Sequence, residues 1–224
     1  MPHGGNMTVK MILAEQQQGG IYMSKSSAMK RNLELAQLGM LSALIVIMTF
    51  VPYIGYISIG ALSITLLHIP LIIGACVLGV KGGVVLGAVW GITCIIKAAT
   101  SPVAITDPLF TNPLVSLLPR VIAGLVAGFV FSLVSKKLKK YHLASILGSV
   151  SACLTNTILV MGSLYLVYGN TSEAAKLGIV QFDLGSFIYF ILGAFGTNAI
   201  FEMILAIIVA VPISHALRKI KIKV

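Results

Sequence analysis

Long apolar runs separated by short polar segments dominate the chain from residue 33 onward. No Asp, Glu, Lys or Arg occurs from Leu35 to Val80, and this run is too long for one membrane helix of about 20 residues. Proline and glycine interrupt this run at Val51–Gly55, and two glycines follow its end at Lys81–Gly83. The pattern predicts six membrane-spanning helices, near 35–53, 65–80, 83–100, 114–134, 143–168 and 186–214.

The connections differ in character. The loop near 54–64 is apolar and partly alternates, which favours an extended segment that folds back over the bundle. The Pro-rich stretch 101–113 and the polar stretch 169–185 are predicted loops. Residues 1–32, which contain glycines and a Gln run, are expected to form a disordered cytoplasmic tail, with Met23 as a candidate start. The membrane domain then spans 33–218, and 219–224 form a basic cytoplasmic tail.

Composition narrows the class. Hydrophobic residues make up 58% of the chain and charged residues 10%, whereas soluble domains have about 45–50% and about 25%. A water-soluble domain and a disordered chain are therefore excluded, which leaves an all-α integral membrane protein. The net charge of +10 would suggest nucleic acid in a soluble protein. Here the basic residues lie between apolar runs, so the predicted surroundings are a lipid bilayer and no nucleic acid.

The basic residues also predict the orientation. In a six-span arrangement only Lys97, Arg120 and Lys176 lie on one side, and the rest of the 16 basic residues lie on the other. Because basic loops stay in the cytoplasm, both termini are expected to be cytoplasmic.

Polar residues inside the spans are the candidates for function. Glu202 lies within the sixth span, with Asn198 four residues earlier on the same helical face. A charge there costs about 2.5–3.5 kcal/mol, so Glu202 is expected to be neutral, paired or beside water. It forms either a wall of a polar ligand cavity or a structural hydrogen bond between helices, and pairing with Arg120 is a third possibility.

Arg120 follows Pro119 near the outer end of the fourth span, and its planar fork of donors suits a carboxylate. Lys97 occupies a similar depth in the third span, and either cation could instead reach the headgroups. Asn156 lies within the fifth span, and Trp90 either packs or forms a stacking wall. The predicted substrate-binding residues are Arg120, Asn156, Asn198, Glu202, Lys97 and Trp90.

Small residues recur four apart, at Gly83, Gly87 and Gly91, at Gly124 and Gly128, and at Gly39 and Ala43. Such stripes let helix backbones approach closely. We expect the stripes of the third and fourth spans to pack inside the bundle, whereas the stripe of the first span could face a different protein.

The sequence lacks the motifs of several enzyme classes. The sequence has no GxxxxGK[ST] loop, so ATP hydrolysis by that route is excluded, and it has no HExxH or GxSxG motif. The three cysteines lack CxxC spacing, and His68 has no second ligand at metal-binding spacing. We predict no enzyme activity, no cofactor and no metal.

Two segments carry a resemblance to a known family. The segment from Ile64 to Ala75 (ITLLHIPLIIGA), the Gly-rich third span and the segment from Asn112 to Arg120 (NPLVSLLPR) resemble the substrate-binding S components of energy-coupling factor (ECF) transporters. The resemblance covers about residues 33–218. The family has an Ala-xxx-Ala pair in its first helix that contacts the membrane T component, and Gly39 and Ala43 stand at the matching positions.

The resemblance implies a function. An S component captures a vitamin from outside, its loops close over the vitamin, and a T component with two cytosolic ATPases supplies the energy. Among substrates the chain looks closest to pantothenate-type members, and pyridoxine- or hydroxymethylpyrimidine-type members are the alternative. A stand-alone proton-coupled transporter using Glu202 and a structural membrane protein are the rivals from other classes.

Overall fold

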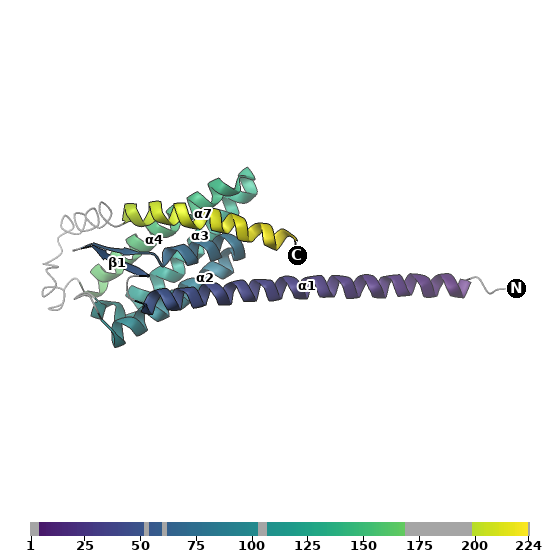
Figure 1. Cartoon of the computed structure of the whole chain (residues 1–224), viewed down its shortest axis with the longest axis horizontal. Helices are drawn as coiled ribbons and strands as arrows, with labels where there is room; N and C mark the ends of the chain where they lie inside the picture. The colour runs from purple at the N-terminus through teal and green to yellow at the C-terminus, as the bar shows by residue number, and fades with distance from the viewer. Residues whose placement is uncertain (1–4, 52–53, 60–61, 103–106, 169–198, 224) are drawn as a thin grey trace.

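A computed structural model describes residues 5–51, 54–59, 62–102, 107–168 and 199–223 of the chain, without side chains at 5–27, 57–59, 62–64 and 220–223. Its elements, in chain order, are α1 (Gly5–Phe50), β1 (Tyr56–Ile59), β2 (Leu62–Thr65), α2 (His68–Thr100), the 3-10 helix η1 (Asp107–Thr111), α3 (Pro113–Leu138), α4 (Tyr141–Tyr168) and α7 (Ile200–Lys223). The helices lie roughly alongside one another (Figure 1).

Helix α2 consists of two arms that run in opposite directions. Gly79 interrupts it with φ 75° and ψ −163°, a conformation that glycine adopts without a steric penalty. Residues on either side of this break lie next to each other: a Cβ built on Gly83 would be 3.1 Å from the Cβ of Ala75. The chain therefore reverses at Gly79, two residues before Lys81, where the sequence predicts the turn between the second and third spans to begin.

Five described helices are long and apolar enough to cross a membrane, which agrees with a helical integral membrane protein. The first arm of α2, residues 68–78, is only about 16 Å long at 1.5 Å per residue, about half the thickness of the hydrocarbon layer. The predicted sixth span near 186–214 begins in 186–198, outside the described residues. The count of six spans stays a prediction.

The segment predicted to be extended forms an antiparallel hairpin. Strands β1 and β2 pair in the register Tyr56↔Thr65 to Ile59↔Leu62, so Tyr56 and Thr65 form the base of the hairpin. The hairpin lies at the end of the bundle where α1 ends and α7 begins (Figure 1). We call this the hairpin end. The expectation of an extended segment that folds back is confirmed here.

The N-terminal segment differs from the expectation of disorder over 1–32. The backbone is helical from Gly5, and this part of α1 projects beyond the bundle as a single helix (Figure 1). An isolated helix gains nothing from tertiary packing, which supplies most helical stability in proteins. The candidate membrane span within α1 is Ala28–Phe50.

The glycine stripe of α2 brings its backbone directly against α3. A Cβ on Gly83 would lie 2.3 Å from the carbonyl oxygen of Gly124, and one on Gly87 would lie 2.3 Å from that of Arg120. No side chain fits at such separations, so these glycines set the distance between the two helices. The prediction that the stripes of the third and fourth spans serve internal packing is confirmed.

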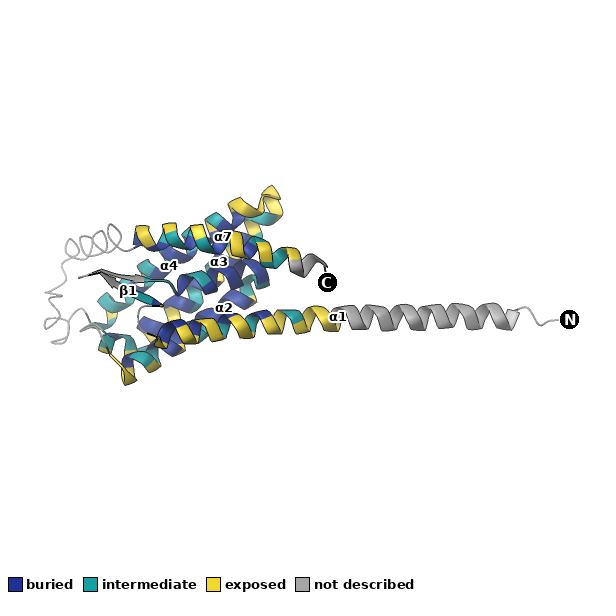
Figure 2. Cartoon of the chain, in the orientation of Figure 1, coloured by how far each residue is buried: buried dark blue, intermediate teal, exposed yellow. Residues whose placement is uncertain are grey.

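Helix α1 presents its small residues outward. Gly39 and Ala43 are exposed, and nothing lies within 4 Å of a Cβ built on Gly39. The opposite face of α1 buries Leu41, Ile45 and Met48 in the core, and the hydroxyl oxygens of Thr49 and Thr93 lie 3.2 Å apart. Figure 2 shows the exposed face along α1. The stripe of the first span is therefore available to another protein.

Basic residues gather at the end of the bundle opposite the hairpin. Lys81 follows the reversal at Gly79, Lys136 and Lys137 lie in the last turn of α3, and Arg218 and Lys219 lie near the end of α7. We call this the basic end. The first residues of α1 and the last of α7 point toward this same side (Figure 1).

A substitution at Gly83 tests the close approach of α2 and α3. Gly83→Ala should destabilise the fold by about 1–3 kcal/mol because the new methyl group overlaps the Gly124 backbone. The matched control is Gly162→Ala on α4, where nothing lies within 4 Å of a built Cβ, and which should be neutral or stabilising by about 0.5–1 kcal/mol. Thermal unfolding in detergent measures both, and equal midpoints for the two variants would contradict the packing described.

Candidate substrate-binding site

Proline positions Arg120. The carbonyl oxygen of Val115 stands four residues before Pro119, which has no N–H to donate to it. The guanidinium of Arg120 takes that place, with Nη1 donating to the Val115 oxygen at 2.5 Å. Asn112 begins the helix, its side chain accepting from the N–H of Leu114 at 2.9 Å. The local sequence therefore fixes the arginine on the first turns of α3, only 7% exposed.

Aromatic rings surround the guanidinium. Its central carbon lies 5.4 Å from the ring centroids of both Trp90 and Phe110. Trp90 in turn meets His68 edge to face, with ring centroids 4.8 Å apart. We call these three residues, from the two arms of α2 and from α3, the His68–Trp90–Arg120 group.

Three nitrogen atoms of this group lack a protein partner. His68 Nε2, Trp90 Nε1 and Arg120 Nε are buried and have no hydrogen-bond partner among the described residues. An unsatisfied buried polar group costs about 1–3 kcal/mol, so three in one place are a strong indication of a site that a polar ligand completes. Arg120 and Trp90 can offer N–H donors to an anionic or carbonyl oxygen.

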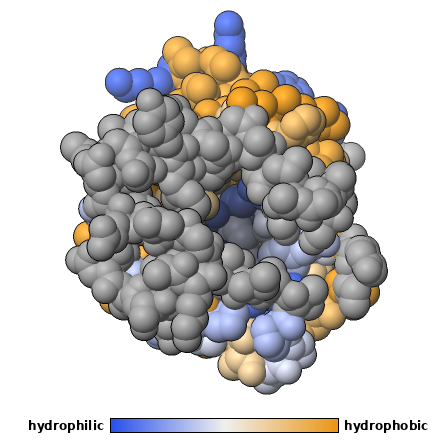
Figure 3. Space-filling model, turned by 90° about the vertical axis from the view of Figure 1, so that its left-hand side faces the viewer, coloured by the Kyte–Doolittle hydropathy of each residue, from blue (hydrophilic) through white to orange (hydrophobic). Residues whose placement is uncertain are grey.

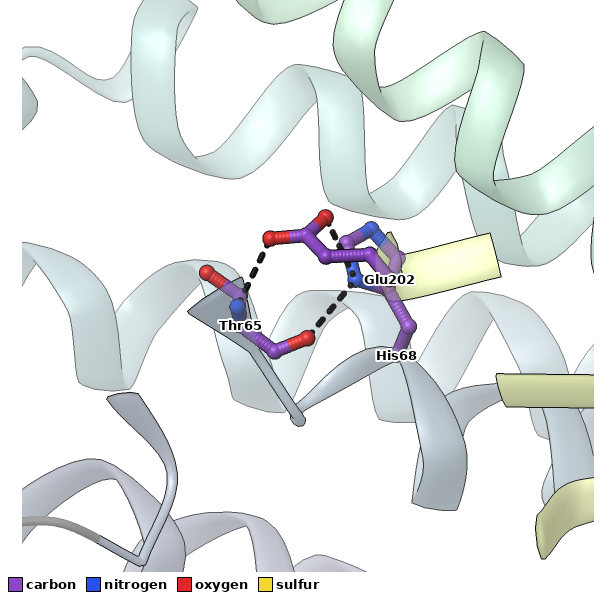
Figure 4. A network of polar contacts seen from close by, with 3 residues as sticks. All are labelled: Thr65, His68 and Glu202. Carbon is purple, nitrogen blue, oxygen red and sulfur yellow. Dashed lines mark hydrogen bonds and ion pairs between the residues drawn. The ribbon is translucent and has the colours of Figure 1, made fainter. Parts of the chain in front are cut away.

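Glu202 belongs to a neighbouring network (Figure 4). One carboxylate oxygen accepts from the backbone N–H of Thr65 at 2.7 Å, and the other lies 3.6 Å from Nδ1 of His68. The third possibility, pairing of Glu202 with Arg120, is not realised among the described residues, where Glu202 pairs with His68. Of these two groups, the backbone N–H of Thr65 at the end of the hairpin is closer to the carboxylate than the His68 ring is.

Lys97 contacts the other strand of the hairpin. Its Nζ lies 3.6 Å above the ring of Tyr56, and the Tyr56 hydroxyl lies 3.2 Å from Sγ of Cys94. Because Tyr56 and Thr65 are register partners, the base of the hairpin is held by the second arm of α2 on one strand and by α7 on the other.

The remaining predicted residues are less closely placed. Asn156 is buried on α4, and its Oδ1 has no partner in the described part of the chain. The structure does not bring it into hydrogen-bonding contact with the described residues of the His68–Trp90–Arg120 group, although α4 packs against α3 and α7. Asn198 lies outside the described residues. The structure thus brings together Arg120 and Trp90, and brings Glu202 to their neighbour His68.

Hydrophilic residues are visible at the hairpin end. Figure 3 views the molecule from this end and shows hydrophilic residues near its centre. A separate small recess at the basic end is lined by Tyr141, His142 and Arg218 among others. That recess lies far along the bundle from Arg120 and has none of the unpartnered nitrogens described above.

Sequence reasoning missed three neighbours of the site. His68 bonds locally through Nδ1 to the Thr65 carbonyl at 3.4 Å and lies beside Trp90, and the sequence gives no sign of this second contact. Phe110 and Tyr56 lie in predicted loops, where no motif indicates a binding residue. The one signal that could have found His68 is its place at a helix start, two residues before Pro70.

Comparisons with known proteins identify the family of the chain. Residues 33–214 match the family described as "ECF transporter, substrate-specific component". A pantothenate transporter, PanT, from Leuconostoc mesenteroides is 31% identical over 78% of this chain and 87% of its own length. A pantothenic acid transporter, PanT, from Lactococcus lactis is 27% identical over 80% of this chain and 90% of its own length. The family and both relatives are transport proteins and not enzymes, as the sequence predicts.

Removing the carboxylate should loosen the hairpin. In Glu202→Ala the N–H of Thr65 loses a charged acceptor, so its hydrogen exchange should accelerate by about tenfold or more. Glu34→Ala, which removes an exposed carboxylate of α1, is the control and should leave this exchange unchanged. Mass-spectrometric hydrogen exchange over the hairpin makes the measurement, and undiminished protection of Thr65 in Glu202→Ala would show that Glu202 does not hold it.

Proposed function

Because the chain belongs to the family of ECF transporter substrate-specific components, we propose that it captures a water-soluble vitamin from outside, with pantothenate favoured. It would deliver the vitamin inward together with a membrane T component and two cytosolic ATPases. The observation that carries the proposal is the set of unpartnered buried nitrogens around Trp90 and Arg120.

The chemistry of the group supports a carboxylate ligand. Arg120 is buried, and no carboxylate of the described chain pairs with it. A buried cation needs a compensating charge, and an arginine fork matches a carboxylate well. Pantothenate carries a carboxylate, an amide and hydroxyl groups, which suit the mixture of charged and neutral nitrogens at this site. The two similar proteins named as pantothenate transporters favour the same choice.

The hairpin suits the role of a cover. It lies at the end of the bundle that would face outward, and its base is held by Lys97 and Glu202. Both contacts are polar and local, so the hairpin can move away without disturbing the α2–α3 packing. We propose Lys97 and Glu202 as residues that hold this cover, whereas Arg120 and Trp90 contact the vitamin, with Asn156 and Asn198 as further candidates.

The orientation follows from charge. The basic end would face the cytoplasm with both termini, and the hairpin end would face outward, since Lys and Arg are retained on the cytoplasmic side. In this orientation the buried His68–Trp90–Arg120 group lies toward the side of the medium from which a vitamin is taken.

Replacement of the arginine tests the substrate. Arg120→Ala should weaken pantothenate binding by more than about 1.5 kcal/mol, roughly tenfold or more, because a charged hydrogen bond is lost. Arg218→Ala, which removes an arginine at the basic end, should leave the affinity unchanged. Calorimetry on the purified protein measures both. Unaltered affinity in Arg120→Ala would remove this arginine from the site, and absence of pantothenate binding in the unmodified protein would defeat the assignment of substrate.

The rival transport mechanism is tested with the same preparations. A stand-alone proton-coupled transporter would move pantothenate into liposomes under a pH gradient without any ATPase. Glu202, already bonded to Thr65 and His68, gives this mechanism little support, because its carboxylate does not stand free. We therefore expect uptake only when the T component and ATPases are present.

The outward face of α1 supports a contact with the T component. Gly39→Leu or Ala43→Leu should abolish co-purification with a T component, because the added side chains keep a second helix from approaching closely. Pantothenate affinity should persist, since neither residue touches the core. Gly162→Leu on α4, also in open space, is the control. Loss of vitamin binding together with co-purification would instead assign the stripe to the fold.

A further inference from the structure

The imidazole of His68 is oriented by two oxygen atoms. Its Nδ1 lies 3.4 Å from the carbonyl oxygen of Thr65 and 3.6 Å from a carboxylate oxygen of Glu202, and Figure 4 shows both on the same side of the ring. A backbone carbonyl can only accept a hydrogen bond. The ring proton is therefore favoured on Nδ1, because a lone pair there would face two oxygen atoms.

Glu202 is itself fixed in place. Its other oxygen accepts from the N–H of Thr65 at 2.7 Å, and the residue is only 9% exposed. One backbone residue, Thr65, thus bonds both the carboxylate and the imidazole. The partner of one ring nitrogen decides what the other nitrogen can do, so Thr65 and Glu202 determine the character of Nε2.

Nε2 points away from these oxygens and has no partner in the described residues. The ring is 1% exposed and lies edge to face with Trp90, on whose ring the Arg120 guanidinium also rests. A second proton on the imidazole would place another buried cation near Arg120, which is costly. The neutral ring with its proton on Nδ1 leaves a lone pair on Nε2.

The three unpartnered nitrogens of the site then differ in whether they donate or accept hydrogen bonds. Trp90 Nε1 and Arg120 Nε can only donate, whereas His68 Nε2 accepts. A hydroxyl group both donates and accepts, so it can join the adjacent Trp90 and His68, while an amide N–H or a carboxylate can satisfy only one of them. This leaves the Arg120 donors for an anionic group.

We infer that His68 Nε2 accepts a hydrogen bond from a hydroxyl group of the substrate, and that Glu202 positions His68 without itself contacting the substrate. The inference rests on the proposed function and extends it, because it makes the site selective for a carboxylate that also carries a hydroxyl. A ligand without the hydroxyl leaves the buried acceptor unmatched, which is an effective source of discrimination.

A cycle of two proteins and two ligands tests the role of His68. The ligands are pantothenate and its dideoxy analogue, which keeps the amide and the carboxylate, and the proteins are the unmodified chain and His68→Phe, which keeps a ring against Trp90. The unmodified protein should bind the analogue roughly three- to tenfold more weakly. His68→Phe should bind pantothenate more weakly than the unmodified protein does, and it should distinguish the two ligands less, because only the Trp90 donor to the hydroxyl remains.

Two outcomes separate this inference from the proposed function. If the unmodified protein binds pantothenate and His68→Phe discriminates between the ligands as strongly as the unmodified protein does, His68 is not the acceptor, and the proposed function stands. If the unmodified protein binds neither ligand, the proposed function fails. His68→Gln retains an acceptor oxygen and should keep part of the discrimination; it also serves if the Phe variant does not fold.

A spectroscopic measurement tests the orientation independently of any ligand. In the nitrogen NMR spectrum of histidine-labelled protein, His68 should show a protonated Nδ1 and an unprotonated Nε2, with the signals assigned by their loss in His68→Gln. Glu202→Gln, whose amide can donate to Nδ1, should shift the proton toward Nε2, whereas Glu34→Gln should not. A protonated Nε2 in the unmodified protein would overturn the inference.

Discussion

The close approach of α2 and α3 is the constraint on which the site depends. Backbone atoms meet where Gly87 passes the carbonyl of Arg120 and where Gly91 passes Leu117, because glycine alone leaves room for a neighbouring backbone at that distance. The stripe ends one residue after Trp90. The spacing that brings the helices together therefore also places the Trp90 indole against the Arg120 guanidinium. A wider separation of α2 and α3 would move these two groups apart.

Polar groups in a lipid-embedded bundle must find partners within the protein. Here side chains bond backbone groups that have no backbone partner. Pro119 leaves the Val115 carbonyl free, and Arg120 bonds it. The hairpin ends at Thr65, whose N–H is taken by Glu202 and whose carbonyl faces His68. At both of these positions a side chain supplies the donor or acceptor that the backbone group needs. The buried nitrogens that have no partner among the described residues, those of His68, Trp90 and Arg120, lie close together.

The sequence predicts the membrane helices well because a segment that crosses lipid must be apolar and must satisfy its own backbone hydrogen bonds. Helix positions for α3 and α4, the extended segment near 54–64 and the reversal near Lys81 all follow from apolar runs and Gly or Pro punctuation. Two features lie beyond that reasoning. Backbone geometry at Gly79 makes the first arm of α2 shorter than a full span, and the helical backbone of residues 5–27 has no apolar pattern that would predict it.

The site is harder to predict because its partners come from distant parts of the chain. Arg120 and Trp90 were selected one at a time, for a fork of donors and for an aromatic face, and their contact depends on the glycine stripe between them. For Glu202 the sequence leaves three alternatives open: a wall of a ligand cavity, a structural hydrogen bond between helices, and pairing with Arg120. In the structure the backbone N–H of Thr65, in a hairpin that no residue type encodes, donates to its carboxylate at 2.7 Å. The other carboxylate oxygen faces His68, so the neighbours of this acid depend on where the hairpin and α7 meet, which the apolar pattern does not predict.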